Sequence, residues 1–340
     1  MKNKEERLEY IDIAKGIAIL LVVVGHTVRR GNPVSEDIVR GLIFSFHMPL
    51  FFVMSAITTR LSQDPYQLLK RTEKSFIRLI VPAISVYLLL QVIGIIRYGI
   101  TGSRKAYLAN IINTLIYSSG VDIASLNIRA LGSLWFLIVL FLSRTIWDYL
   151  NLRLSKRNAT LAGVVLAIIG YCFAIVQWLP LSFELALIAL PFMFIGGYLK
   201  RYSKEEPSVY RMISSIIAWL VLFWIVFKSS GHYLEMATRE FPLLPLSYTC
   251  AVAGVMFVYE LSKYISKVRL LSNIFAYLGI ISMEIYIIHA MDGLSHSIWG
   301  EISTNTYITA SVRVVSDVLL ALALFNFKSI LKRGVKKVDR

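Results

Sequence analysis

The chain has 340 residues, of which 56% are hydrophobic and only 17% are charged. Soluble domains carry about 25% charged residues, so these apolar side chains are too many for the core of an ordinary soluble domain. The net charge of +15 would suggest a nucleic-acid partner in a soluble protein. Here the Lys and Arg residues lie in short segments between apolar blocks, so we expect membrane lipids and no nucleic acid as partners.

Ten apolar blocks follow one another, and each has the ~20 residues that a helix needs to cross ~30 Å of hydrocarbon. The first block has no small-residue cleavage site after it, so we expect it to remain as a helix. The expected spans are 11–28, 39–59, 76–96, 133–150, 159–177, 183–199, 211–228, 243–261, 272–291 and 307–327. In the long break after the third span, the amphipathic stretch Tyr107–Tyr117 is expected to form a surface or re-entrant helix.

The distribution of positive charge predicts the orientation of these spans. With the N-terminus in the cytoplasm, the inner segments hold most of the 36 Lys and Arg residues, so both termini are expected to be cytoplasmic. No internal repeat or soluble segment is visible, so we expect one all-α integral membrane domain over residues 1–340. Cys172 and Cys250 lie inside apolar blocks without metal-ligand spacing, and we expect them to be packing residues, with no metal bound.

The first span contains three ionisable residues, Asp12, Lys15 and His26, which are costly in lipid and therefore indicate function. Lys15 and His26 are eleven residues apart, close to three helical turns, so they share a face and differ in depth by roughly 16 Å. A structural alternative stays open for both. Lys15 could extend to the inner headgroups while paired with Asp12, and His26 could be an interfacial residue.

A second histidine, His47 in the segment FSFHMPLFF, enters the next span from the outer side. Two imidazoles that meet inside a helical bundle indicate a site. The unperturbed pKa of histidine, ~6.5, suits it to take a proton near neutral pH. We therefore select His26 and His47 as catalytic candidates.

The inner segment KRTEKSFIRLIVP ends at Pro82 and places Lys74 and Arg78 on one helical face. The positive-inside rule alone would explain most of these residues. Arg78, however, lies past the start of the apolar run. A phosphate-bearing ligand that enters from the cytoplasm would meet Lys15 and Arg78.

The segment YLGIISMEIYIIH near the end of the chain contains Glu284 and His289. We expect Glu284 to face the interior and to pair with Arg313 of the last span. His289 lies near the outer end, and both an interfacial and a functional role stay open. His232 and His296 are in outer loops and are not assigned a role.

The opening LEYIDIAKGIAILLVVVGHT resembles that of the integral-membrane acyltransferase family 3, whose mark is Arg or Lys, ten residues, then His. Lys15 and His26 fit this mark, with Lys where Arg is commoner. FHMPLFFVMSA resembles the second block of the family, although Ala56 stands where Gly is usual. Three more segments complete the resemblance over nearly the whole chain: SLWFL with Trp135, FMFIGGYL, and SMEIYIIH.

The third-span basic pair of the family, which precedes a proline, is similar to Lys74, Arg78 and Pro82. A further arginine that often stands beside them is replaced here by Ser75 or Ile77.

The resemblance implies a ten-helix bacterial enzyme of the cytoplasmic membrane, of the sugar O-acetyltransferase or fucose 4-O-acetylase-like kind. Such an enzyme moves an acetyl group from cytoplasmic acetyl-CoA to a sugar hydroxyl of a surface glycan or its lipid-linked precursor. The catalytic histidine of the family corresponds to His26. Its first-span cation corresponds to Lys15, and its CoA-side cations to Lys74 and Arg78. We expect Asp12, Glu284 and Trp135 to support the site.

Our hypothesis is that the CoA phosphates bind near these cations and that His26 removes the proton of the acceptor hydroxyl. His47 then binds the acceptor or stabilises the oxyanion. An acetyl-histidine relay on His26, the identity of the acyl group and glycan, and a homodimer stay open.

The main alternative is a proton-coupled transporter of a sugar or an acylated glycan precursor. The lack of an inverted repeat or a Gly/Pro-broken helix pair disfavours it. A noncatalytic scaffold is the third class, and it would need no pair of imidazoles.

Overall fold

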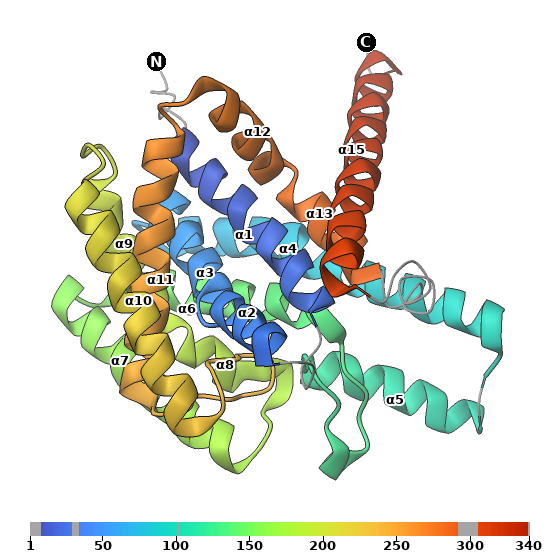
Figure 1. Cartoon of the computed structure of the whole chain (residues 1–340). Helices are drawn as coiled ribbons and strands as arrows, with labels where there is room; N and C mark the ends of the chain where they lie inside the picture. The colour runs from blue at the N-terminus through green and yellow to red at the C-terminus, as the bar shows by residue number, and fades with distance from the viewer. Residues whose placement is uncertain (1–7, 29–33, 101, 292–304, 339–340) are drawn as a thin grey trace. The chain divides into compact units, whose positions relative to one another are not determined.

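A computed structural model describes residues 8–28, 34–100, 102–291 and 305–338, and every regular element in these ranges is a helix (Figure 1). Extended backbone pairs there only as two isolated bridges, Ile123 with Ile128 and Glu235 with Glu240. Eight helical segments are long and apolar enough to span a membrane, and two bent pairs raise the number to as many as ten. The expected all-α fold is confirmed, and the chain is a multi-pass membrane protein.

The spanning segments follow the expected apolar blocks closely. They are α1 (Glu9–Thr27), Glu36–Thr58 from α2 (Val34–Phe44) and α3 (His47–Thr58), α4 (Pro65–Tyr98), Gly132–Arg153 with α6 (Trp135–Arg153), α7 (Lys156–Val176), α10 (Val209–Ser230), α11 (Leu244–Ile265) and Thr306–Lys328 of α15 (Thr306–Val338). The expected helix in the long break is also present, as α5 (Arg104–Tyr117), which is not among the candidate spans.

Two spans expected as single ranges are bent. Pro180–Ile188 and Leu190–Tyr202, which contain α8 (Phe183–Ile188) and α9 (Leu190–Leu199), meet at 47°, and α12 (Arg269–Ile280) and α13 (Ser282–Met291) meet at 58°. A proline lies in the first turn of α9, where its missing N–H interrupts a continuous ladder. These bends correct the expectation that the chain lacks broken helix pairs.

Contacts divide the chain into two compact, interleaved units. The first unit comprises residues 1–51, 205–234 and 243–340, and the second comprises 52–204 and 235–242. The single domain over residues 1–340 stays a prediction.

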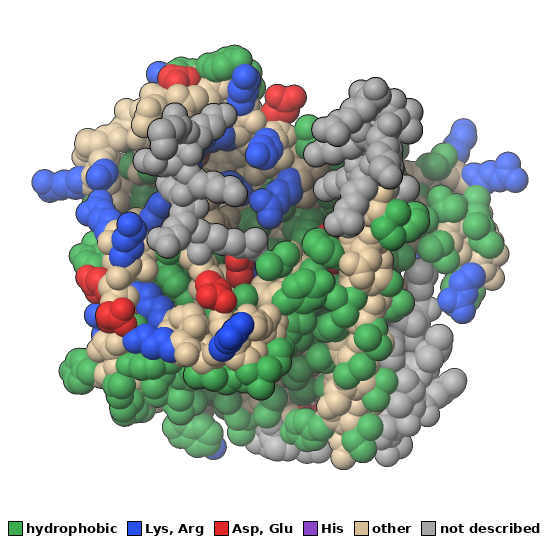
Figure 2. Space-filling model, turned by 90° about the horizontal axis from the view of Figure 1, so that it is seen from above, with side chains coloured by type: hydrophobic (Ala, Val, Ile, Leu, Met, Phe, Trp, Pro, Cys, Tyr) green, Lys and Arg blue, Asp and Glu red, His purple; other side chains and the backbone are tan. Residues whose placement is uncertain are grey.

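Within the first unit, α1 and α12 pack with their backbones in close contact. A Cβ atom added to Gly279 would collide with the backbone carbonyl of Asp12, and one added to Gly16 would collide with that of Phe275. Small residues allow this close approach of membrane helices. In Figure 1, α1 begins and α15 ends at the same end of this unit. Figure 2 looks onto that end and shows Lys and Arg side chains among hydrophobic ones; the cytoplasmic location of the termini stays a prediction.

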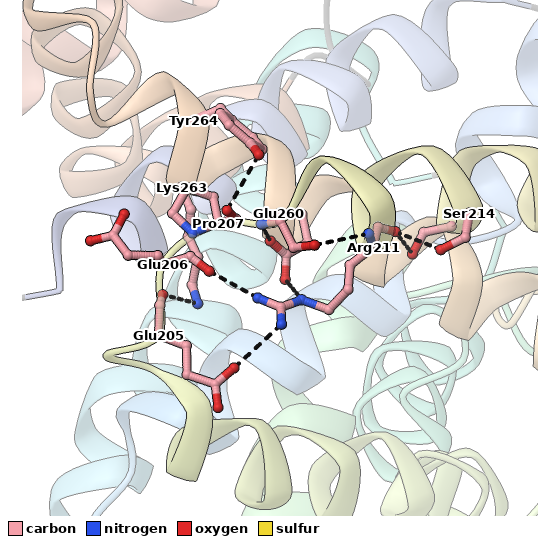
Figure 3. A network of polar contacts seen from close by, with 10 residues as sticks. Glu205, Glu206, Pro207, Arg211, Ser214, Glu260, Lys263 and Tyr264 are labelled. Atoms are coloured by element: carbon pink, nitrogen blue, oxygen red, sulfur yellow. Dashed lines mark hydrogen bonds and ion pairs between the residues drawn. The ribbon is translucent and has the colours of Figure 1, made fainter.

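A set of ion pairs and hydrogen bonds joins the start of α10 to the end of α11, and we call it the α10–α11 network (Figure 3). The buried carboxylate of Glu260 accepts hydrogen bonds from Arg211 Nε at 2.7 Å and from the Ser208 backbone N–H at 2.9 Å. Arg211 also pairs with Glu205 at 3.4 Å, and Lys263 donates to the Glu205 carbonyl at 2.9 Å. Donors and acceptors are thus matched, as in a structural element.

Candidate functional site

Three histidines of the first unit lie close together, and we call His26, His47 and His289 the histidine cluster. His26 is in the last turn of α1, and its ring lies 5.4 Å from that of His289 and 5.3 Å from that of Phe44, between centroids. The Phe44 ring lies 4.7 Å from that of His47. The structure thus gathers the two predicted histidines around one phenylalanine and adds a third, His289.

His47 begins α3 and is fully buried. Its Nδ1 lies 3.0 Å from the carbonyl of Ile43, and since a carbonyl can only accept, Nδ1 carries the proton. In a neutral ring, Nε2 is then a hydrogen-bond acceptor.

His289 comes from α13 and pairs with Asp317 of α15. The Nδ1 atom of His289 lies 3.2 Å from Oδ2 of Asp317, and both side chains are buried. From the sequence, the role of His289 stayed open and Asp317 was not predicted as a site residue. Asp317 could have been found from the sequence, because an acidic residue inside an apolar block such as 307–327 indicates function by itself.

Two arginines hold the last turn of α1. Arg40 of α2 donates from Nη1 to the carbonyl of Gly25 at 2.9 Å and from Nε to the hydroxyl of Tyr233 at 2.8 Å. Arg313 of α15 is buried and donates to the hydroxyl of Thr27 at 3.1 Å. The lower ends of α1 and α15 lie side by side in Figure 1. The two chain neighbours of His26 are therefore both held in place, Gly25 by Arg40 and Thr27 by Arg313.

The ring of His26 is accessible. His26 is exposed although its neighbours Gly25 and Thr27 are both buried. The surrounding helices hold this exposed residue beside two further imidazoles. Such an arrangement suits proton transfer to and from a bound hydroxyl group.

At the other end of α1, Lys15 lies 3.9 Å from Asp12, which is the ion pair that the structural alternative requires. Because α1 is one unbroken helix, Lys15 and His26 share a face, with a rise of roughly 16 Å between them.

The expected pairing of Glu284 with Arg313 is wrong. Glu284 instead pairs with Lys328, also of α15, at 3.2 Å. Arg313 faces α1, about four turns away from Lys328 along α15.

In the second unit, Lys74 and Arg78 are exposed on α4. Arg71 and Arg78 act electrostatically on Arg144 of α6, and we call these three residues the arginine group. The opposing charge is Asp148, whose carboxylate also accepts two hydrogen bonds from Ser62, at 2.7 and 2.8 Å. In the sequence, Arg144 is a charge inside the expected span 133–150. The excess of positive charge suits this group to bind an anion.

Trp135 is buried in the second unit, where its ring packs over Gly120 and lies 6.2 Å from that of Phe136. These contacts give it a packing role in the loop before α6.

The model of one protein family, described as an acyltransferase domain, matches residues 8–324 of the chain. No curated protein and no solved structure matches it.

Proposed function

The chain belongs to the membrane acyltransferase family 3, and from this premise we propose that it is an O-acetyltransferase. It moves an acetyl group from cytoplasmic acetyl-CoA to a hydroxyl group of a surface glycan or its lipid-linked precursor, in the cytoplasmic membrane of a bacterium. Acyl transfer follows from the family, whereas the donor, the acceptor and the residue roles are part of the proposal.

The observation that carries the proposal is the accessible imidazole of His26 within the histidine cluster. His26 takes the proton of the acceptor hydroxyl, and the oxygen attacks the carbonyl carbon of the thioester. The C–S bond then breaks and CoA leaves. His47 has its Nδ1 proton bound to Ile43, so in a neutral ring Nε2 accepts a hydrogen bond from the acceptor. This favours acceptor binding over stabilisation of the oxyanion.

Lys74 and Arg78 bind the phosphates of CoA together with Arg71 and Arg144 of the arginine group, and Lys15 stays a predicted CoA ligand. Guanidinium groups bind phosphate in a bidentate manner. An excess of arginine within a membrane-spanning region is costly without an anion, which supports this assignment.

The test is acetyl turnover by the purified chain in detergent, with acetyl-CoA as donor and lipid-linked glycans or surface polysaccharide as acceptors. His26→Ala is expected to lower the rate by ~10²–10⁴, the usual effect of losing a general base. His232→Ala is the matched control, because His232 is an exposed loop histidine outside the cluster, and it should keep the parent rate. Equal rates for the two variants would refute the role of His26.

The two bent helix pairs favour a transporter as the second candidate, since broken helices line the sites of many transporters. A glycan uptake assay in proteoliposomes separates the two. Glycan movement by the parent chain without any acetyl turnover would favour transport over transfer.

A further inference from the structure

His26 and His289 are neighbours in unlike electrostatic surroundings. His289 faces the carboxylate of Asp317 at 3.2 Å, and the Asp317 side chain is fully buried. The largest electrostatic influences on His26 come from His289, His47, Arg40 and Arg313, which are imidazole and guanidinium groups.

These surroundings separate the two rings by charge. A carboxylate at hydrogen-bond distance stabilises a positive imidazolium, whereas nearby guanidinium groups oppose a second positive charge. Two titratable groups whose environments differ in this way can divide the acid and the base roles of one reaction. His289 is suited to hold a proton, and His26 is suited to accept one.

The acyl transfer proposed above needs both roles. The acceptor hydroxyl must lose a proton, and the CoA thiolate, with a thiol pKa near ~8.5, is a better leaving group when it receives one. An enzyme with one imidazole must use it twice, but this chain places two within reach of each other.

We propose that His289 is the general acid of this acyl transfer and that Asp317 is its positioning residue. Neutral His26 takes the hydroxyl proton, the alkoxide forms the new C–O bond, and the C–S bond breaks. Protonated His289 gives its Nε2 proton to the departing sulfur. The imidazolium of His26 then returns a proton to His289, directly or through one water, and this step restores both rings. Asp317 keeps the Nδ1 proton of His289 in place throughout and is not itself protonated.

The competing explanation is that the pair of His289 and Asp317 only joins α13 to α15. A structural pair and a general acid differ in one measurable respect, which is how strongly the effect of removing the histidine on the reaction rate depends on the leaving group. An aromatic thiolate leaves readily without a proton, so an aromatic thioester needs no general acid. We therefore compare acetyl-CoA with S-acetyl thionitrobenzoate as donors for the full-length chain in detergent.

His289→Gln should lower the acetyl-CoA rate by ~10²–10⁴ and the aromatic thioester rate at least ~10-fold less. Asp317→Asn should shift the ratio of the two rates in the same direction by a smaller factor. His26→Gln should lower both rates alike, because both donors need the base. An unchanged rate ratio in folded His289→Gln would overturn the proposal.

Glu260→Gln is the matched control, since it also replaces a buried carboxylate of the first unit by an amide, in the α10–α11 network. It should leave the rate ratio of the two donors unchanged. A shift in Glu260→Gln equal to that in Asp317→Asn would mean that the ratio reports general damage, and would overturn the assignment.

A measurement on the parent chain covers the case in which the variants fail to fold. The solvent deuterium isotope effect should be larger with acetyl-CoA than with the aromatic thioester, because only the reaction of acetyl-CoA includes proton transfer to the leaving sulfur. Equal isotope effects would overturn the proposal. A parent chain without turnover of either donor would instead refute the acyltransferase function itself.

Discussion

The α10–α11 network and the histidine cluster both bury ionisable groups in the first unit, but their charges are matched differently. In the network, Glu260 accepts from both Arg211 and a backbone N–H, and its side chain is only 1% exposed. In the cluster, Asp317 pairs with His289, yet the adjacent ring of His26 is exposed. A closed network fixes two helices, whereas a cluster with one open ring can also exchange protons with a ligand.

The largest expected effect that tests this contrast comes from Glu260→Ala. It leaves Arg211 and the Ser208 N–H without their buried acceptor. Because the Arg211 side chain is 39% exposed, the loss should stay below the about 3–5 kcal/mol that breaking a fully buried pair costs. Thermal unfolding in detergent measures the loss, and acetyl turnover per folded molecule should stay at the parent value. Ser214→Ala, at the edge of the network, is the control and should cost below about 0.5 kcal/mol. A loss of turnover per folded molecule would contradict the purely structural role of the α10–α11 network.

Gly279→Ala tests whether backbone packing or polar contacts position α1. The new methyl group would meet the Asp12 carbonyl, and overpacking of this kind costs about 1–3 kcal/mol. Gly94→Ala is the matched control, because no atom lies within 4 Å of the added Cβ and an alanine in a helix is favourable by about 0.5–1 kcal/mol. Melting temperatures should therefore move in opposite directions. Equal changes would show that Arg40 and Arg313 hold α1 in place without the glycine contact.

Arg144→Gln extends the contrast to the second unit, where positive charge is in excess. We expect the KM for acetyl-CoA to rise ~10-fold, about 1.4 kcal/mol, with the KM for the acceptor unchanged. Arg78→Ala should act in the same direction. Arg97→Gln, in the last turn of α4 and 19 residues after Arg78, serves as the control. A change confined to the acceptor KM would reverse the assignment of this group to the donor.

The smallest effect is expected at the exposed edge of the network. The hydrogen bond and the charge of Lys267 lower the pKa of Glu206, and the two side chains lie 2.6 Å apart. A lowered carboxyl pKa adds stability above the ordinary value of ~4.3 and loses it as the pH falls through the folded-state value. The melting difference between the parent and Lys267→Ala should thus shrink on acidification and in high salt. A difference that grows at low pH would show that the carboxylate is not the partner.

The helices were predictable from the sequence because each apolar block is long and is bounded by charged or Pro/Gly-containing segments. The bends were not, since Leu, Ile and Ala continue through Ala189 and Ile281 and hydropathy does not change there. The bend between α8 and α9 has a proline as its local cause, and that residue was visible in the sequence.

The site was predictable only where its residues share one helix. Lys15 and His26 follow from the helical period alone. The pairing of His289 with Asp317, and of Glu284 with Lys328, depends on the relative axial position of α13 and α15. The hydrophobic periodicity of the sequence does not specify that position. The grouping of Arg144 with Arg78 likewise depends on the packing of α4 against α6.

The interleaving of the two units also determines when the site can form during synthesis. Residues 52–204 are made without interruption, so most of the second unit can assemble early. In contrast, α1 packs against α11, α12, α13 and α15, all of which emerge from the ribosome more than 200 residues later. Until then, the Asp12 carboxylate and the His26 imidazole have none of these neighbours in the bilayer. The first helix therefore gains most of its packing partners only after the last helices have been made.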